Sequence, residues 1–198
     1  FGGWNGKDFF NDTIVYDLEK MIWNKLETFG TPLPRMGHAS CVVGSHLIIQ
    51  GGFYFDSEQY RKNINNYGTY LKSCYFNDLK VLNLENNTWA QLKTSGQPPQ
   101  PRFGHTISFI NSELIIFGGW SCNSGRKFNA MVNSTQNEYT EDGVYLYSLN
   151  TKNTTWEKAK YTGQIPSNRY GHSASIIRQN IIYFGGWEFG KALNDINI

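Results

Sequence analysis

The sequence predicts an all-β protein built from repeated units, and three observations support this prediction. A Pro/Asn-Arg-x-Gly-His motif occurs three times, and its arginines, Arg35, Arg102 and Arg169, are 67 residues apart. A glycine pair follows each motif at the same spacing, and a tryptophan marks a third point of each unit. Apolar runs of strand length separate these markers, with no helical periodicity.

Each unit contains four predicted strands. The first follows the Gly-His motif and alternates polar with apolar residues, as in 106–110. The second is apolar on both faces and ends at the glycine pair, as in 114–117, which indicates burial on both sides. The third is amphipathic, as in 80–84, and one copy is expected at 144–149; the fourth carries the tryptophan. A linker rich in glycine and proline, 95–101, closes the unit, so each unit is typical of a β-propeller blade.

The combined pattern resembles the kelch-repeat family of galactose-oxidase-like propellers. Arg-x-Gly-His, the glycine pair, an Asn-Asp pair before the third strand and the strand-four tryptophan carry the resemblance. It implies a partial kelch-type β-propeller of about three four-stranded antiparallel blades. The expected boundaries give the outer strands of a first blade at 1–33, a second blade at 34–100, a third at 101–167, and the inner strands of a fourth at 168–198.

Composition excludes several classes of protein. The 198 residues are 39% hydrophobic and 17% charged, which is globular composition rather than that of a disordered chain. The net charge of +2 predicts no general attraction to nucleic acid or to an anionic membrane. Three cysteines cannot all pair and lack metal-ligand spacing, so we expect a reducing compartment, cytoplasmic or nuclear.

Most motif residues are expected to be structural. The glycine pairs should end a buried strand where the neighbouring backbone comes close. The tryptophans should pack against the next blade, and the histidines should be core residues rather than a metal site, because each lies in its own repeat. These residues are Gly51, Gly52, Gly118, Gly119, Gly185, Gly186, Trp23, Trp89, Trp156, His38, His105 and His172.

Two insertions, 53–76 and 120–142, lie between the second and third strands of the middle units, where the outer units have nine residues. Antiparallel topology places both insertions and the repeated arginines on one face. Their aromatic residues either anchor a partner or pack the loops together, and both interpretations stay open. The candidates are Phe53, Tyr54, Phe55, Tyr60, Tyr67, Trp120, Phe128 and Tyr139.

The three arginines also have two interpretations. The preferred one is that each binds carbonyl groups of an adjacent turn. In the alternative, Arg35, Arg102 and Arg169 form a ring that holds a carboxylate or phosphate of a partner.

These observations predict a non-catalytic protein-interaction module, a scaffold or adaptor that binds through the insertion-bearing face, with an acidic or phosphorylated segment as one kind of partner. One alternative is the regulatory kelch domain of a larger signalling enzyme, such as a kelch-containing Ser/Thr protein phosphatase. A catalytic propeller acting on a sugar or small molecule is a further alternative. We expect no cofactor, because the sequence contains neither a copper-ligand inventory, nor a nucleophile elbow, nor a phosphate-binding loop.

About three blades leave open edges, since propellers have about 4 to 8 blades. We expect the chain to be an excerpt of a longer propeller. Two chains joined into one ring is the alternative, but 1–12 and 184–195 would then compete for the same blade position.

Overall fold

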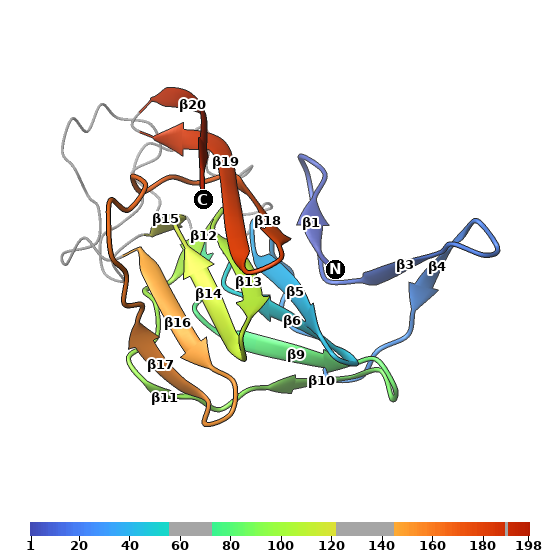
Figure 1. Ribbon diagram of the computed structural model, residues 1–198. Helices are drawn as coiled ribbons and strands as arrows, with labels where there is room; N and C mark the ends of the chain where they lie inside the picture. The colour runs from blue at the N-terminus through green and yellow to red at the C-terminus, as the bar shows by residue number, and fades with distance from the viewer. Residues whose placement is uncertain (56–72, 122–144, 189) are drawn as a thin grey trace.

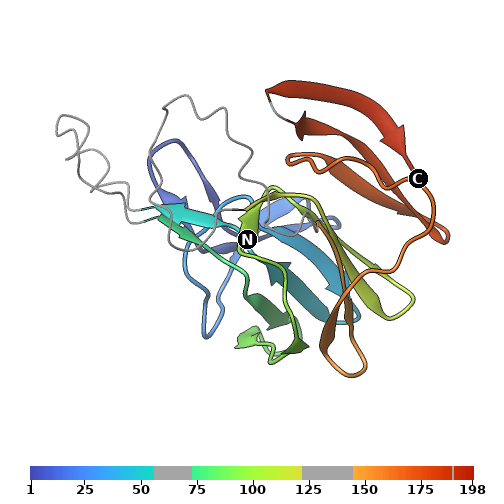
Figure 2. The same ribbon diagram turned by 90° about the vertical axis from the view of Figure 1, so that its left-hand side faces the viewer.

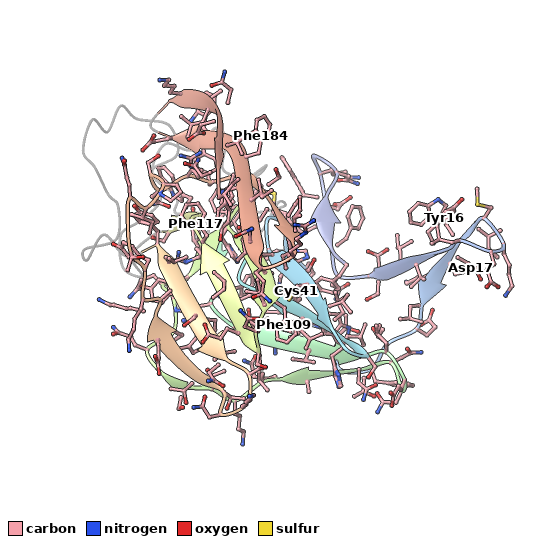
Figure 3. All side chains as sticks on the ribbon, in the orientation of Figure 1. Tyr16, Asp17, Cys41, Phe109, Phe117 and Phe184 are labelled. Carbon is pink, nitrogen blue, oxygen red and sulfur yellow. The ribbon has the colours of Figure 1, made fainter. Side chains whose placement is uncertain are left out.

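A computed structural model describes residues 1–55, 73–121, 145–188 and 190–198, and these ranges contain strands and no helix. The strands form sheets that are antiparallel except for one added strand, and these sheets fan out around a common axis (Figure 1). The innermost strands of successive blades are β5, Ala39–Val43, β13, Thr106–Ile110, and β18, Ser173–Ile177. Cys41 and Phe109, on the first two of these strands, lie near the centre of the fan (Figure 3). The all-β prediction is confirmed.

The second blade is a four-stranded sheet in the expected order. From the axis outward it contains β5, then β6, His46–Gln50, β9, Leu79–Asn83, and β10, Thr88–Gln91. All its neighbouring strands are antiparallel. Alternate residues face the two adjoining blades, which is why the strands are apolar on both faces.

The third blade has a fifth strand that the sequence did not predict. Its order from the axis is β13, β14 (Glu113–Phe117), β16 (Leu146–Asn150), β17 (Thr155–Lys158) and β11 (Ser95–Gly96). The strand β11 comes from the expected linker and runs parallel to β17, and Ser95 Oγ lies 2.8 Å from Thr155 Oγ1. The expected first residue of the third strand, Val144, lies outside the described residues.

The first and last blades are incomplete within the chain. The first has only its outer hairpin, β3 (Thr13–Asp17) with β4 (Ile22–Leu26), which projects away from the other sheets (Figure 1). The last has β18, β19 (Asn180–Glu188) and β20 (Lys191–Asn197), with a bulge between Phe184 and Gly186. Figure 2 shows this last sheet, in red, beside the third blade.

Short strand pairs extend three of the blades on one side. They are β1 (Gly3–Trp4) with β2 (Phe9–Phe10), β7 (Phe53–Phe55) with β8 (Ser73–Tyr75), and β12 (Arg102–Phe103) with β15 (Trp120–Ser121). The strands β7 and β8 are therefore the described ends of the first insertion, and β15 begins the second insertion, paired with the motif strand β12. Residues 56–72 and 122–144 lie outside the described part.

The core lies between blades, and the tryptophans pack in the direction opposite to the one expected from the sequence. Trp156 is 3% exposed and its Nε1 donates to Thr94 Oγ1 at 3.1 Å, a residue of the preceding blade. The ring of Trp89 lies 5.0 Å from that of Phe1, also in the preceding blade. The prediction that each tryptophan packs against the next blade is therefore wrong. In each strand pairing, the tryptophan shares its face with the leucine opposite, and that face is turned toward the preceding unit.

The terminal blades follow the same packing direction, since the residues that would face a missing neighbour are exposed there. Trp23 is 71% exposed, since no described sheet covers this face of the β3–β4 hairpin. Phe117, which precedes Gly118 and Gly119, is 1% exposed. The centre of its ring lies 4.5 Å from that of Tyr183 in the next blade. Its counterpart Phe184 is 51% exposed on the outer side of the last sheet (Figure 3).

Each glycine pair lies where two blades touch. Gly52 N–H donates to the Arg102 carbonyl of the next blade at 2.8 Å, and Gly119 N–H donates to the Arg169 carbonyl at the same distance. A Cβ on Gly51 would lie 2.8 Å from the Arg102 carbonyl oxygen and 2.9 Å from the His105 ring. A side chain there would push the blades apart, and the left-handed φ of +67° adds strain for any other residue.

Replacing Gly51 with alanine should lower the free energy of unfolding by about 3 kcal/mol, because backbone strain of about 1–2 kcal/mol and steric overlap add. Gly44→Ala is the matched control. Gly44 has a φ of +57° in the same blade, but no atom within 4 Å of its Cβ position, so we expect a loss of about 1 kcal/mol. Urea unfolding of both variants measures the difference, and equal losses would show that contact between blades contributes nothing.

Candidate functional site

The side of the fan that carries the short strand pairs is called the insertion face below. It contains β1–β2, β7–β8, β12–β15 and the part of β19 that follows its glycine pair. Backbone hydrogen bonds join neighbouring blades here: Gly104 N–H donates to the Gly37 carbonyl and Gly171 N–H to the Gly104 carbonyl, both at 2.7 Å. The Arg-x-Gly-His motifs therefore meet around the axis on this face.

Arg35 is buried and fully engaged. Its side chain is 1% exposed, and its Nη1 and Nη2 donate to the two carboxylate oxygens of Asp78 at 2.6 and 2.9 Å. Nη1 also donates to the Gly51 carbonyl at 2.8 Å, and Nε donates to the Leu33 carbonyl at 3.2 Å. The guanidinium lies 4.0 Å from the centre of the Phe76 ring.

The bond from the motif arginine to the glycine-pair carbonyl occurs in the other two blades as well, and Arg169 also repeats the pair with a carboxylate. Arg169 is 3% exposed and donates to Asp195 through Nη1 and Nη2, at 2.6 and 3.0 Å, and to the Gly185 carbonyl at 3.2 Å. These bonds hold the pKa of the Asp195 carboxyl far below its usual range. Arg102 is 1% exposed and donates to the Gly118 carbonyl at 2.8 Å.

Burial of Arg35, Arg102 and Arg169 is incompatible with the alternative interpretation, in which a ring of accessible guanidinium groups holds a partner. Each arginine instead binds the carbonyl of its own glycine pair, as in the preferred interpretation, because an internal cation must be paired and hydrogen-bonded. The sequence reasoning missed the carboxylate partners Asp78 and Asp195. Their signal was present, since each belongs to the Asn-Asp pair that precedes a third strand.

A second repeated feature on this face is an aromatic residue directly after every glycine pair. These residues are Trp4, Phe53, Trp120 and Trp187, with exposed fractions of 44%, 8%, 39% and 42%. Only Phe53 and Trp120 were singled out from the sequence. The signal for the other two was the aromatic residue that repeats with the glycines.

Each of the last three aromatic residues is paired across strands with the variable residue of its own motif. The pairs are Met36 with Phe53, Phe103 with Trp120, and Tyr170 with Trp187. Aromatic rings of neighbouring blades also contact one another. The distances between ring centres are 5.8 Å for Phe53 and Phe103, 6.0 Å for Phe103 and Tyr170, and 5.8 Å for Trp120 and Tyr170. We call Trp4, Met36, Phe53, Phe103, Trp120, Tyr170 and Trp187 the mouth cluster.

The first insertion adds aromatic contacts to the mouth cluster. The Phe9 ring lies 5.2 Å from Tyr54 and 4.8 Å from Phe55, while Trp4 lies 6.1 Å from Phe55. Tyr54 and Phe55 are half-buried, so they both pack the blades together and keep some surface. The candidates Tyr60, Tyr67, Phe128 and Tyr139 lie outside the described residues.

The repeated histidines are packed between blades. The His105 ring lies beside Gly51 of the preceding blade, and His172 Nε2 lies 2.9 Å from Thr106 Oγ1. Burial lowers the pKa of His38 and of His172 to about 4, with the nearby arginines acting in the same direction, and it lowers the pKa of His105 well below its usual value. Within the described ranges, no three His, Cys, Asp or Glu side chains are grouped to hold a metal ion. The described residues contain no helix able to cross a membrane.

Replacing Asp78 with alanine should lower the free energy of unfolding by about 3 kcal/mol, because it leaves the buried Arg35 cation without its carboxylate. The control is Lys20→Ala, which removes a surface pair with Asp17 whose side chains are 71% and 30% exposed, and should cost about 0.5 kcal/mol. Urea unfolding measures both. Equal effects would mean that the internal pair is no stronger than a surface one.

Stability should fall on acidification because the histidines are buried in the neutral form. Above about pH 6.5 histidine is mostly neutral in both the folded and the unfolded chain, so the stability is at its full value. Below that pH the unfolded chain binds protons first, and the free energy of unfolding decreases as the pH falls toward 4. For His172 the loss is on the order of 3 kcal/mol. His172→Gln should flatten the dependence of the urea midpoint on pH across this window, and an unchanged slope would contradict the assignment.

Comparison with known proteins identifies the family. A family model described as the KLHDC2/KLHL20/DRC7 Kelch-repeats domain matches residues 1–138. Tip elongation aberrant protein 1 of Schizosaccharomyces pombe is 30% identical over 189 residues, which cover 94% of this chain and 14% of that protein. Host cell factor of Drosophila melanogaster is 32% identical over 187 residues, 87% of this chain and 11% of that protein.

A third relative, the Rho GTPase-activating protein gacHH of Dictyostelium discoideum, is 39% identical over 120 residues, 60% of this chain and 7% of that protein. The chain thus spans a small part of the length of these relatives. Kelch repeats generally form non-catalytic domains that bind protein partners. The family model covers more than half of the chain and agrees with the all-β blades and their repeated motifs: the chain belongs to the kelch-repeat family.

Proposed function

We propose that this chain is a non-catalytic protein-interaction module that binds its partner through the insertion face. The observation that carries the proposal is the mouth cluster, in which the residue after every glycine pair is aromatic and Trp4, Trp120 and Trp187 are each about 40% exposed. Exposed tryptophans are uncommon on a surface without a partner and are enriched in binding hot spots.

Rigid support of the mouth cluster favours the same function. The rings stand on short strand pairs that are tied by backbone hydrogen bonds to the motifs of the same blade, such as Trp187 N–H to the Tyr170 carbonyl at 2.9 Å. A side chain that is held in place before binding loses little conformational entropy when a partner arrives. The partner therefore needs an apolar or aromatic anchor to cover these rings.

This proposal assigns recognition to aromatic side chains and not to the repeated arginines. The charges of the buried Arg35 and Arg169 side chains are already balanced by Asp78 and Asp195, whose side chains are 22% and 44% exposed. An acidic or phosphorylated segment would have to displace those carboxylates to reach the two guanidinium groups, and so would first break both bidentate pairs.

A second candidate is that the chain forms the kelch part of a larger signalling protein. The match to a segment that makes up 7% of a Rho GTPase-activating protein favours it. In that case the insertion face would bring a partner to another domain. For either candidate we propose a cytoplasmic or nuclear setting, in which the thiols of Cys41 and Cys74 stay reduced.

Replacing Trp120 and Trp187 together with serine should weaken partner capture at least tenfold, because two exposed anchors are lost while the core is unchanged. The measurement is affinity capture from the lysate of the source organism, with the bound proteins compared between variant and wild type. A second variant shortens 53–76 and 120–142 to the nine-residue connection of the outer units.

The control for surface apolarity is Leu18→Ser together with Met21→Ser, two residues that are 80% and 68% exposed in the turn that joins β3 and β4. These changes should leave capture unchanged. Equal capture by wild type and by both insertion-face variants would contradict the proposal and would direct attention to the opposite face.

A further inference from the structure

A cavity lies between the second and third blades, at the end of the fan opposite the insertion face. Its volume is about 500 Å³, within the range of small-molecule sites. The turns that join first to second and third to fourth strands border it, through His46, Asn86, Thr151 and Thr154. In antiparallel blades these turns lie at the end away from the connections between second and third strands. The cavity is therefore separate from the mouth cluster.

The floor of this cavity is apolar. Ile48, Val81 and Leu92 line it from the second blade, and Leu114 lines it from the third. Ile48 and Leu114 are 6% and 0% exposed and belong to the main core, so this part of the floor is rigid, while Val81 and Leu92 are only half-buried. An apolar group that enters would remove this surface from water without first opening the core.

Small side chains leave the space open. Thr88 and Ala90 line the cavity, where the equivalent strand of the first blade has Ile22 and Asn24. Thr151 borders it from the third blade, at the position equivalent to Leu84 of the second. The cavity thus results from the particular residues of these two blades and is not a general property of the repeat.

The rim is polar and uncharged. Asn83 and Asn86 border the cavity, and their side-chain oxygens already accept hydrogen bonds from the backbone N–H of Glu85 at 2.8 Å and of Thr88 at 3.1 Å. The amide NH₂ groups therefore remain as the donors that the rim offers to a ligand. Among the described residues that line the cavity, none is Lys, Arg, Asp or Glu and His46 is the one titratable side chain, so a ligand charge would lose hydration without a permanent counter-charge.

We propose that this cavity binds an uncharged, amphiphilic small molecule. Its apolar body fills the space between the two blades, and its hydroxyl, ether or carbonyl oxygens accept hydrogen bonds from the amides of Asn83 and Asn86. This site is independent of the protein partner, because it lies at the opposite end of the blades from the mouth cluster.

Three probes with the same eight-carbon tail test the proposal: octyl glucoside, octyl sulfate and octylammonium, each below its micelle-forming concentration. Backbone amide shifts of the ¹⁵N-labelled chain report binding. Octyl glucoside should shift the amides of Thr88, Ala90 and Thr151 in a saturable way, and the two charged probes should bind at least tenfold more weakly.

Two variants fill the cavity from opposite walls, Ala90→Phe from the second blade and Thr154→Phe from the third. Each should weaken octyl glucoside binding at least tenfold while leaving the urea midpoint near that of wild type. Asn24→Phe, at the position of the first blade equivalent to Ala90, is the matched control and should bind as wild type. Binding that survives both filling variants, or that is equally strong for all three head groups, would overturn the proposal; no saturable shift with octyl glucoside would do the same.

Discussion

The structure depends on the close approach of neighbouring blades at their glycine pairs. The second glycine of each pair donates its N–H to the motif arginine's carbonyl in the next blade, at 2.8–2.9 Å in three successive copies. Only hydrogen fits beside the first glycine, since the next histidine ring and that carbonyl occupy the space of a Cβ. This contact fixes the spacing between blades, and that spacing sets how deeply the tryptophans and leucines interlock. The mouth cluster follows from it, because its aromatic residues come directly after the glycines.

The buried charge of the motif arginine stabilises the backbone at the glycine pair of its own blade. The glycine pair turns its first carbonyl inward, where it would be an unsatisfied acceptor without the arginine that follows the linker. The arginine in turn requires a carboxylate, which the third strand supplies through Asp78 or Asp195. Three strands of one blade are thereby tied at a single point. From the sequence, the three arginines could form a ligand-binding ring. In the structure, each one instead joins strands within its own blade.

The sequence was sufficient to predict the fold because spacing alone revealed the repeat, the strands and the position of both insertions. It could not give the direction of inter-blade packing: the tryptophans were expected to face the next blade, and they face the preceding one, since strand alternation does not say which neighbour lies on which side. It also could not show that the arginines are internal, because burial of a cation depends on a partner 43 residues away, as for Arg35 and Asp78. Two of the three exposed tryptophans of the mouth cluster, Trp4 and Trp187, were missed, although they occupy the same repeat position as Trp120.

The strand β11 has a consequence for how the protein opens. Chain leaving the second blade lies along the outermost strand of the third, and a single bridge between Phe29 and Thr88 begins the same arrangement one unit earlier. The outer edge of the third sheet is thus covered by chain from the second blade rather than exposed as a free edge. Local unfolding of the third blade from its outer edge would first have to separate β11 from β17. Slow amide hydrogen exchange should therefore extend outward to the tryptophan strand of the third blade, and local opening should propagate between adjacent units.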